Sequence, residues 1–252
     1  MEKLFKMTSP ASLLTLVFCL FFAAEIFAQQ KSEPSFAVGL APFSLLLPSG
    51  KVNVRGEWAY ASNKSLSLLV AIPRPTPAPN LLGNQFDLED DASTSVNRFT
   101  SFGTTLEHRF YLGQNAPRGF YFAPYSRYNS FSLERTSQNT ENQYKTTVKG
   151  SLGGFGFGLA AGVQFRLGDF LTMDATLAGV DFKWMNARFD YSTTDPEADL
   201  SAFRDKVEET VGDIPLIGSK FDITIEDNTV KAKTPGVVLP GYRFNLTVNY
   251  IF

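Results

Sequence analysis

The strongest constraint in this sequence of 252 residues is an alternation between two kinds of side chain that continues to its last residue. Large apolar side chains occupy every second position, at Tyr242, Phe244, Leu246, Val248, Tyr250 and Phe252. Small or polar side chains lie between them, at Gly241, Arg243, Asn245, Thr247 and Asn249, with Ile251 as the one apolar exception. Successive side chains of a β-strand point to opposite faces of a sheet. The pattern therefore predicts a strand with one bulky apolar face and one small or polar face.

The same period of two recurs along the chain and predicts eight strands. The expected strands cover 35–47, 52–60, 65–72, 101–110, 120–129, 154–167, 171–177 and 241–252. The parity is blurred around Pro42, and it slips beyond Gly179, which indicates a bulge. Short connections at 62–64, 112–118 and 167–169 alternate with long ones at 73–97, 135–143 and 190–236, and only the first connection, 48–50, breaks this rule by being short.

The composition of the two faces indicates which of them meets lipid. The polar face consists mainly of Gly, Ala, Ser and Thr with a few charges, which suits a narrow barrel interior, whereas the other face is bulky and aromatic, as a lipid-facing surface is. A closed barrel also satisfies every backbone hydrogen bond, as a bilayer requires. No apolar run reaches the ~18–20 residues of a spanning helix. We therefore expect an all-β fold, an eight-stranded antiparallel transmembrane β-barrel.

Overall composition excludes several classes of protein. The chain is 44% hydrophobic and 14% aromatic, which a disordered chain would not be. One Cys cannot build a disulfide scaffold or a Cys-based zinc site. The formal net charge of −2 argues against a nucleic-acid binder, which should carry a basic excess.

Residues 1–28 have the features of a secretory signal peptide. Lys3 and Lys6 give a positive start, and 11–24 form an apolar core of the expected length. We expect cleavage after Ala28, so that 29–252 form the barrel. Cys19 lies inside the apolar core and not at its end, which disfavours a lipoprotein signal.

The signal peptide, the eight alternating strands and the terminal Phe252 resemble the small OmpA/OmpX-type outer-membrane barrels. The paired phrases at 107–111 (EHRFY) and 117–121 (PRGFY) resemble barrel proteins of Bacteroidota without a defined function. The resemblance implies location in the bacterial outer membrane, contact with its lipid, and insertion by the outer-membrane assembly machinery. It implies no activity, because this scaffold hosts structural proteins, adhesins and a few enzymes.

The parity of the strands points a set of charged side chains into the barrel. These are Arg55, Glu57, Glu107, Arg109, Arg127, Asp174 and Arg243. Two carboxylates such as Glu57 and Glu107 could perform acid–base chemistry. The favoured interpretation is a structural network of Arg–carboxylate pairs, because buried charges must pair. The glycines at 150–162 are likewise expected to line a crowded interior and not a phosphate-binding loop.

The sequence predicts no catalytic, cofactor or metal residue. His108 is expected on the outer face near a short turn, without a Ser-His-carboxylate set. A lipid-modifying barrel enzyme, the first alternative, would need His and Ser near the outer rim. A soluble periplasmic barrel that binds a small hydrophobic ligand, the second, would need a polar outer face. Calcium binding by the acidic run 87–91 stays open, because carboxylate oxygens suit that ion.

The last long connection, 190–236, differs from the others because it predicts structure of its own. Asp195 can cap a helix that Gly212 ends, with Leu200, Phe203, Val207 and Val211 along one side. Alternating residues on either side of 227–228 predict a small hairpin. Either this insertion packs on itself as a cap over the barrel mouth, or the stripe of Leu200, Phe203 and Val207 binds an extracellular protein partner. We expect a non-enzymatic protein with a structural or surface-interaction role.

Overall fold

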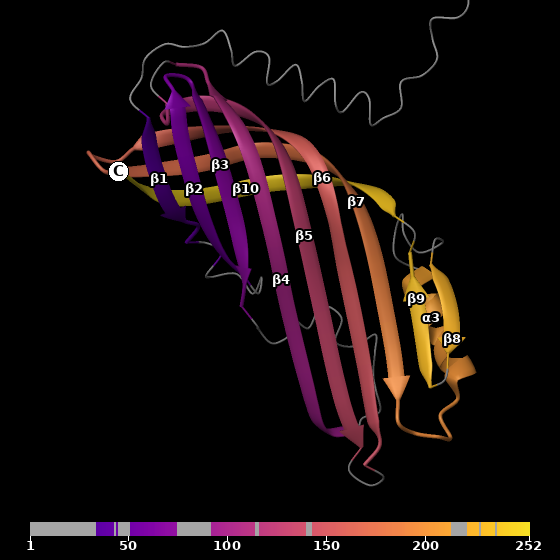
Figure 1. The fold of residues 1–252 in the computed structure, drawn as a ribbon. Helices are drawn as coiled ribbons and strands as arrows, with labels where there is room; N and C mark the ends of the chain where they lie inside the picture. Colours follow the sequence, from indigo (N-terminus) through magenta and orange to yellow (C-terminus); the bar gives the residue numbers. More distant parts are fainter. Residues whose placement is uncertain are drawn as a thin grey trace, which may run out of the picture.

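The fold is a closed ring of antiparallel strands with a taller wall on one side (Figure 1). The computed structural model describes residues 34–42, 44, 51–74, 92–113, 116–139, 143–212, 221–226, 228–234 and 236–252. The elements are β1 (Ser35–Leu40), β2 (Lys51–Ala61), β3 (Lys64–Pro73), β4 (Ala92–Tyr111), β5 (Gly119–Asn139), β6 (Lys145–Arg166), β7 (Leu171–Thr193), α3 (Leu200–Gly212), β8 (Asp222–Glu226), β9 (Thr229–Lys233) and β10 (Val237–Ile251). The predicted signal peptide at 1–28 and the acidic run at 87–91 lie outside the described residues.

The ring confirms the expected eight-stranded antiparallel barrel. Strands β1 to β7 pair in sequence order, and β10 closes the ring by pairing with both β1 and β7. The last contact of the closure is the amide of Phe252, which donates to the carbonyl of Phe36 at 2.8 Å. Short connections (62–63, 112–118 and 167–170) lie at the end of the barrel where β1 begins and β10 ends, which we call the turn end.

Strand lengths differ from the sequence prediction at several ends. Strand β1 stops at Leu40 and does not reach 47, because Pro42 has no amide hydrogen to continue the ladder. The first connection is therefore 41–50 and not the short 48–50, so it agrees with the alternation of short and long connections. Strands β4, β5 and β7 instead continue into 92–97, 135–139 and 190–193, which were expected to be loop.

The predicted phase slip is a bulge in β7. Against β6 and β10 the register shifts between Thr176 and Gly179, and Leu177 and Ala178 both lie on the exposed side. Before the bulge the even-numbered residues of β7 point inward. After it the odd-numbered residues do, starting with Gly179 and Asp181, both of which are buried.

The long strands β4 to β7 continue beyond the ring and form what we call the sheet extension (Figure 1). On β6 the extension runs from Gly154 back to Lys145, about 30 Å along the strand. Strand β9 pairs with β7 through Arg188–Ser192 and lies in line with β10, and β8 forms the outer edge. The predicted hairpin is thus part of the barrel wall, and it is not a separate cap.

Helix α3 begins later than expected. The side chain of Asp199 accepts a hydrogen bond from the amide of Ser201 at 2.9 Å, so Asp199 is the helix cap. Asp195, the expected cap, instead accepts from the amide of Glu197 in the preceding turn. The helix ends at Gly212 as expected. Among the described residues, no helix is both long and apolar enough to cross a membrane.

Candidate functional site

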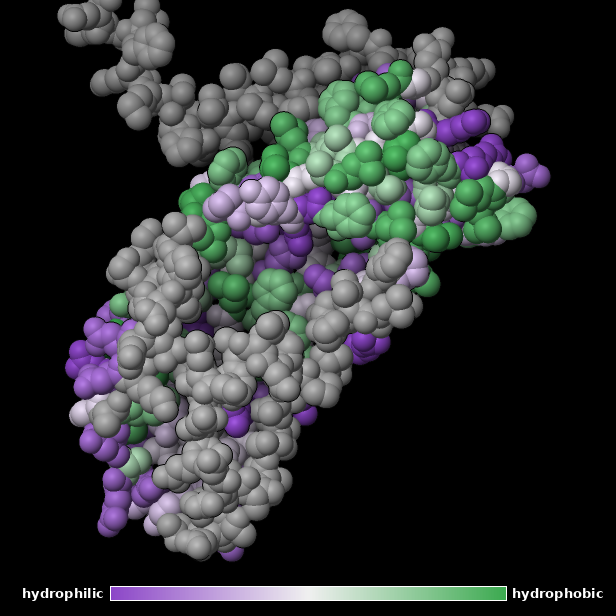
Figure 2. All heavy atoms as spheres, turned by 180° about the vertical axis from the view of Figure 1, so that it is seen from behind, coloured by the Kyte–Doolittle hydropathy of each residue, from purple (hydrophilic) through white to green (hydrophobic). Residues whose placement is uncertain are grey.

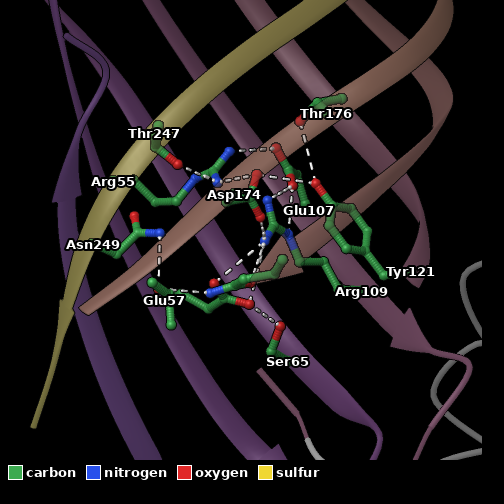
Figure 3. A network of polar contacts seen from close by, with 12 residues as sticks. Arg55, Glu57, Ser65, Glu107, Arg109, Tyr121, Asp174, Thr176, Thr247 and Asn249 are labelled. Carbon is green, nitrogen blue, oxygen red and sulfur yellow. Dashed lines mark hydrogen bonds and ion pairs between the residues drawn. The ribbon is translucent and has the colours of Figure 1, made fainter. Parts of the chain in front are cut away.

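The lower half of the ring holds a compact ion-pair network, which we call the lumen network (Figure 3). Its members are Arg55, Glu57, Glu107, Arg109, Asp174 and Arg243. The shortest contacts that fix it are Arg109 Nη1 to Asp174 Oδ2 at 2.5 Å and Arg55 Nη1 to Asp174 Oδ1 at 2.7 Å. The structure therefore brings together six of the seven charged residues expected inside the barrel.

Glu107 is the most highly connected carboxylate of the lumen network. Its Oε2 lies 2.8 Å from Arg109 Nη2, its Oε1 lies 3.9 Å from Arg55 Nη2, and Arg243 donates to Oε1 from a third direction. Glu107 is 1% exposed and Arg55 and Arg109 are 0% exposed. Three arginines and three carboxylates balance in charge, so the network satisfies the rule that buried ions are paired.

Neutral side chains complete the lumen network, and the sequence analysis did not single them out. Tyr111 donates to Glu57 Oε1 at 2.7 Å, and Ser65 donates to the same oxygen at 2.6 Å. Tyr121 donates to Asp174 Oδ1 at 3.2 Å. Tyr111 and Tyr121 both have the inward parity of the charged residues on their strands, so parity was the signal that could have identified them.

The seventh expected residue, Arg127, belongs to a separate group that we call the upper ion cluster. Arg127 Nη1 lies 3.6 Å from Asp181 Oδ2, and Lys183 Nζ lies 3.1 Å from Asp181 Oδ1. Tyr125 donates to the same carboxylate at 3.1 Å. The sequence analysis missed Asp181 and Lys183 because the parity of Asp174 extends to them only through the bulge.

The geometry of Glu57 and Glu107 fits a structural role better than acid–base chemistry. A catalytic pair needs access to a substrate proton. Both carboxylates are 1% exposed, and each is held by at least one arginine. An eight-stranded barrel has an interior that side chains just fill. The lumen network thus plugs this level of the barrel.

A cavity of about 320 Å³ lies above this plug, on the β1 to β4 side of the ring. Three of its lining residues are cations, Lys51, Arg127 and Arg243, and none of its lining residues is acidic. Amides and hydroxyls make up most of the remaining polar lining: Ser44, Asn53, Thr105, Asn129 and Asn245.

The glycines of β6 serve the packing of the interior, as expected. A Cβ added to Gly158 would approach the ring carbon Cζ of Tyr125 to 2.7 Å, and one added to Gly156 would meet the Cγ of Lys183 at the same distance. The absent side chains leave room for Tyr125 and Lys183, which bond to Asp181. Glycine at these positions is therefore a requirement of space.

Aromatic side chains mark two levels on the outer face of the ring. Tyr128, Phe155 and Trp184 lie opposite one another in register on β5, β6 and β7, and form what we call the upper aromatic row. At the turn end lie Phe120, Phe122, Phe165, Phe170, Tyr250 and Phe252, all at least 46% exposed. His108 belongs to this lower level, since its Nε2 lies 2.5 Å from the hydroxyl of Tyr60 and its ring packs on Phe110.

The polarity of the two faces inverts at the upper aromatic row. Below it the outer side chains are apolar, and above it they are polar, for example Ser151 and Arg188. The inner side chains change in the opposite sense, from ions to Phe131, Phe189 and Tyr191. Figure 2 shows the hydrophobic surface gathered over the ring and the hydrophilic surface over the sheet extension.

Helix α3 covers part of the apolar inner face of the sheet extension. Phe203 stacks on Tyr191, with ring centroids 3.3 Å apart, and Val207 is 1% exposed. Leu200 joins the same apolar cluster, together with Val230 of the hairpin. The stripe expected as a partner-binding surface is therefore engaged within the chain, because the open sheet would otherwise expose these aromatic rings.

Comparisons with known proteins add little to this geometry. No family model matches the sequence, and no curated protein does. A major outer membrane protein from Thermus thermophilus matches with 13% identity and a TM-score of 0.36, covering 87% of this chain and 98% of that chain. CarO of Acinetobacter baumannii matches with 13% identity and a TM-score of 0.37, covering 87% of this chain and 97% of that chain. Neither likeness bears on what the chain does.

Proposed function

We propose that this chain is a non-enzymatic barrel protein of the bacterial outer membrane, exported by the signal at 1–28 and inserted by the outer-membrane assembly machinery. The observation that carries the proposal is the inversion of polarity at the upper aromatic row. A bilayer requires an apolar outer band bounded by aromatic residues, and water above it requires a polar outer face. A soluble barrel would not expose Leu159 at 62% and Phe182 at 63% on its outer face.

In this proposal the sheet extension stands outside the cell. Outer-membrane barrels have short periplasmic turns and longer extracellular loops, and the short connections here lie at the turn end. The role of the protein is then structural or one of surface interaction, with the polar outer face of the extension presented to an extracellular protein partner. Its architecture suits the small OmpA/OmpX-type barrels, including those of Bacteroidota.

Cysteine labelling of intact cells tests the proposal. Cys19 is the one native cysteine and precedes the expected cleavage site, so the mature chain offers a cysteine-free background. We expect a membrane-impermeant maleimide to label Ser151→Cys, which lies on the outer face of the extension, and not Leu159→Cys, which lies in the apolar band. Equal labelling of both variants, with the protein in the soluble periplasmic fraction, would refute the membrane location.

Heat-modifiability provides a second readout. A folded barrel resists detergent unfolding until it is heated, because its strand pairing is closed. The unboiled protein should therefore migrate differently from the boiled protein on a gel, and its mature chain should begin at Gln29.

A further inference from the structure

We propose that the cavity above the lumen network is a binding site for an oxyanion, either a carboxylate or a phosphate. The proposal concerns the interior of the ring, and it stands whether or not the sheet extension binds a partner. Its basis is an excess of positive charge together with buried hydrogen-bond donors that have no acceptor.

The charge balance around the cavity is positive. In the lumen network three arginines face three carboxylates, so Arg243 adds no net charge there. In the upper ion cluster two cations, Arg127 and Lys183, share the single carboxylate of Asp181. Lys51 adds another cation to the lining, which contains no acidic residue. Two positive charges thus remain without a compensating carboxylate at the level of the cavity.

The donor groups point to the same ligand chemistry. Arg243 is 7% exposed, and while its Nη2 bonds to Glu107, its Nη1 is buried without a hydrogen-bond partner. Asn245, two residues further along the same inward face of β10, has a buried Nδ2 that also lacks a partner. Both residues line the cavity. A buried donor without an acceptor is costly, and an oxyanion offers several acceptor lone pairs to such donors.

The walls of the cavity leave two sources for the oxyanion. The lining includes Phe244 and Leu246, whose side chains belong to the outer face of β10, as well as Arg243 and Asn245 on the inner face. A free anion would use only the polar wall. An amphiphile with an acidic head would use the polar wall for its head and the apolar residues for its chain.

Calorimetric titration of the refolded protein in nonionic micelles tests the site with inorganic phosphate, dodecyl phosphate and, as a neutral probe, dodecanol. We expect a phosphate-bearing probe to bind and dodecanol not to bind. Tighter binding of dodecyl phosphate than of inorganic phosphate assigns the site to an amphiphile. Equal binding of the two assigns it to a free oxyanion.

Three variants separate this site from general attraction of anions. Arg127→Gln removes a charge, and Asn245→Leu removes an unpaired donor without disturbing any ion pair. Each should weaken binding about tenfold or more, the effect of losing one charge-assisted hydrogen bond. Lys149→Gln removes the same charge as Arg127→Gln from the exposed outer face of the extension and should leave the affinity unchanged.

The heat-modifiability of each variant shows that it is folded, so that a loss of binding is a loss of the site. The proposal is overturned if no phosphate-bearing probe binds the wild-type protein. It is equally overturned if Lys149→Gln weakens binding as much as Arg127→Gln, or if Asn245→Leu binds as well as the wild type.

Discussion

Removing Glu107 should destabilise the barrel more than removing any exposed carboxylate. Glu107→Ala deletes the shared partner of Arg55, Arg109 and Arg243 and leaves all three guanidinium groups in a level of the barrel that excludes water. Asp174 and Glu57 then face three cations with two negative charges. Breaking a buried ion pair by removing one partner typically costs ~3–5 kcal/mol, and we expect a loss in that range.

The matched control is Glu134→Ala. Glu134 also pairs with a cation, since its Oε1 lies 3.5 Å from Lys149 Nζ, but the two side chains are 42% and 60% exposed. An exposed pair of this kind contributes ~0–1 kcal/mol. The two variants therefore remove the same chemical group and differ in burial.

The assay is equilibrium unfolding by urea of the refolded protein in micelles, followed by tryptophan fluorescence. Trp58 lies at the turn end of the outer face and Trp184 lies in the upper aromatic row, so the signal reports on both ends of the ring. If the midpoint of Glu107→Ala equals that of Glu134→Ala, the inward orientation and pairing of Glu107 are wrong.

Three further changes test other parts of the molecule. Replacing 196–234 by a short Gly/Ser linker should leave heat-modifiability intact, because β10 closes the ring without it, but should make the upper part of β7 sensitive to protease in intact cells; loss of barrel assembly would contradict this. Leu159→Arg should reduce the free energy of unfolding by ~2–4 kcal/mol, since it puts a charge in the apolar band, whereas Ser151→Arg should have little effect in the same urea titration. Gly158→Val should lower the urea midpoint because its side chain would collide with Tyr125, and an unchanged midpoint would show that the interior is less crowded than the structure indicates.

Much of the ring could be predicted from the sequence because side-chain parity has a physical cause in a barrel wall. A strand between lipid and a filled interior must alternate apolar and small or polar residues, and Arg55, Glu107 and Arg243 follow this rule. Parity alone also predicted that charges of both signs would share one interior. It could not predict that Glu107 would be shared by three arginines, since that depends on which strands are neighbours and at what height.

The misses have equally definite causes. Asp181 has the outward parity of its strand until the bulge at Leu177 and Ala178 reverses it, and the position of a bulge is set by the neighbouring strands. The end of β1 at Leu40 depends on Pro42, which can be accommodated at the edge of a strand or can end it. The sheet extension was expected to be loop because its residues at 92–97 and 135–139 are polar on both faces.

The position of helix α3 follows from the inversion of polarity. In the ring, the inner face needs no cover, because the strands surround it and the ions of the lumen network pair across it. Above the upper aromatic row the wall is an open sheet, and its inner face becomes apolar with Phe189 and Tyr191. An open sheet cannot bury such a face against itself, and a second layer is needed to do so. The helix supplies that layer with Phe203 and Val207, and it does so from the same connection that contributes β8 and β9 to the wall. The chain therefore uses one pairing pattern in two solvents. Strands β6 and β7 cross from one to the other without interruption, and only the sidedness of their residues and the presence of a helix change.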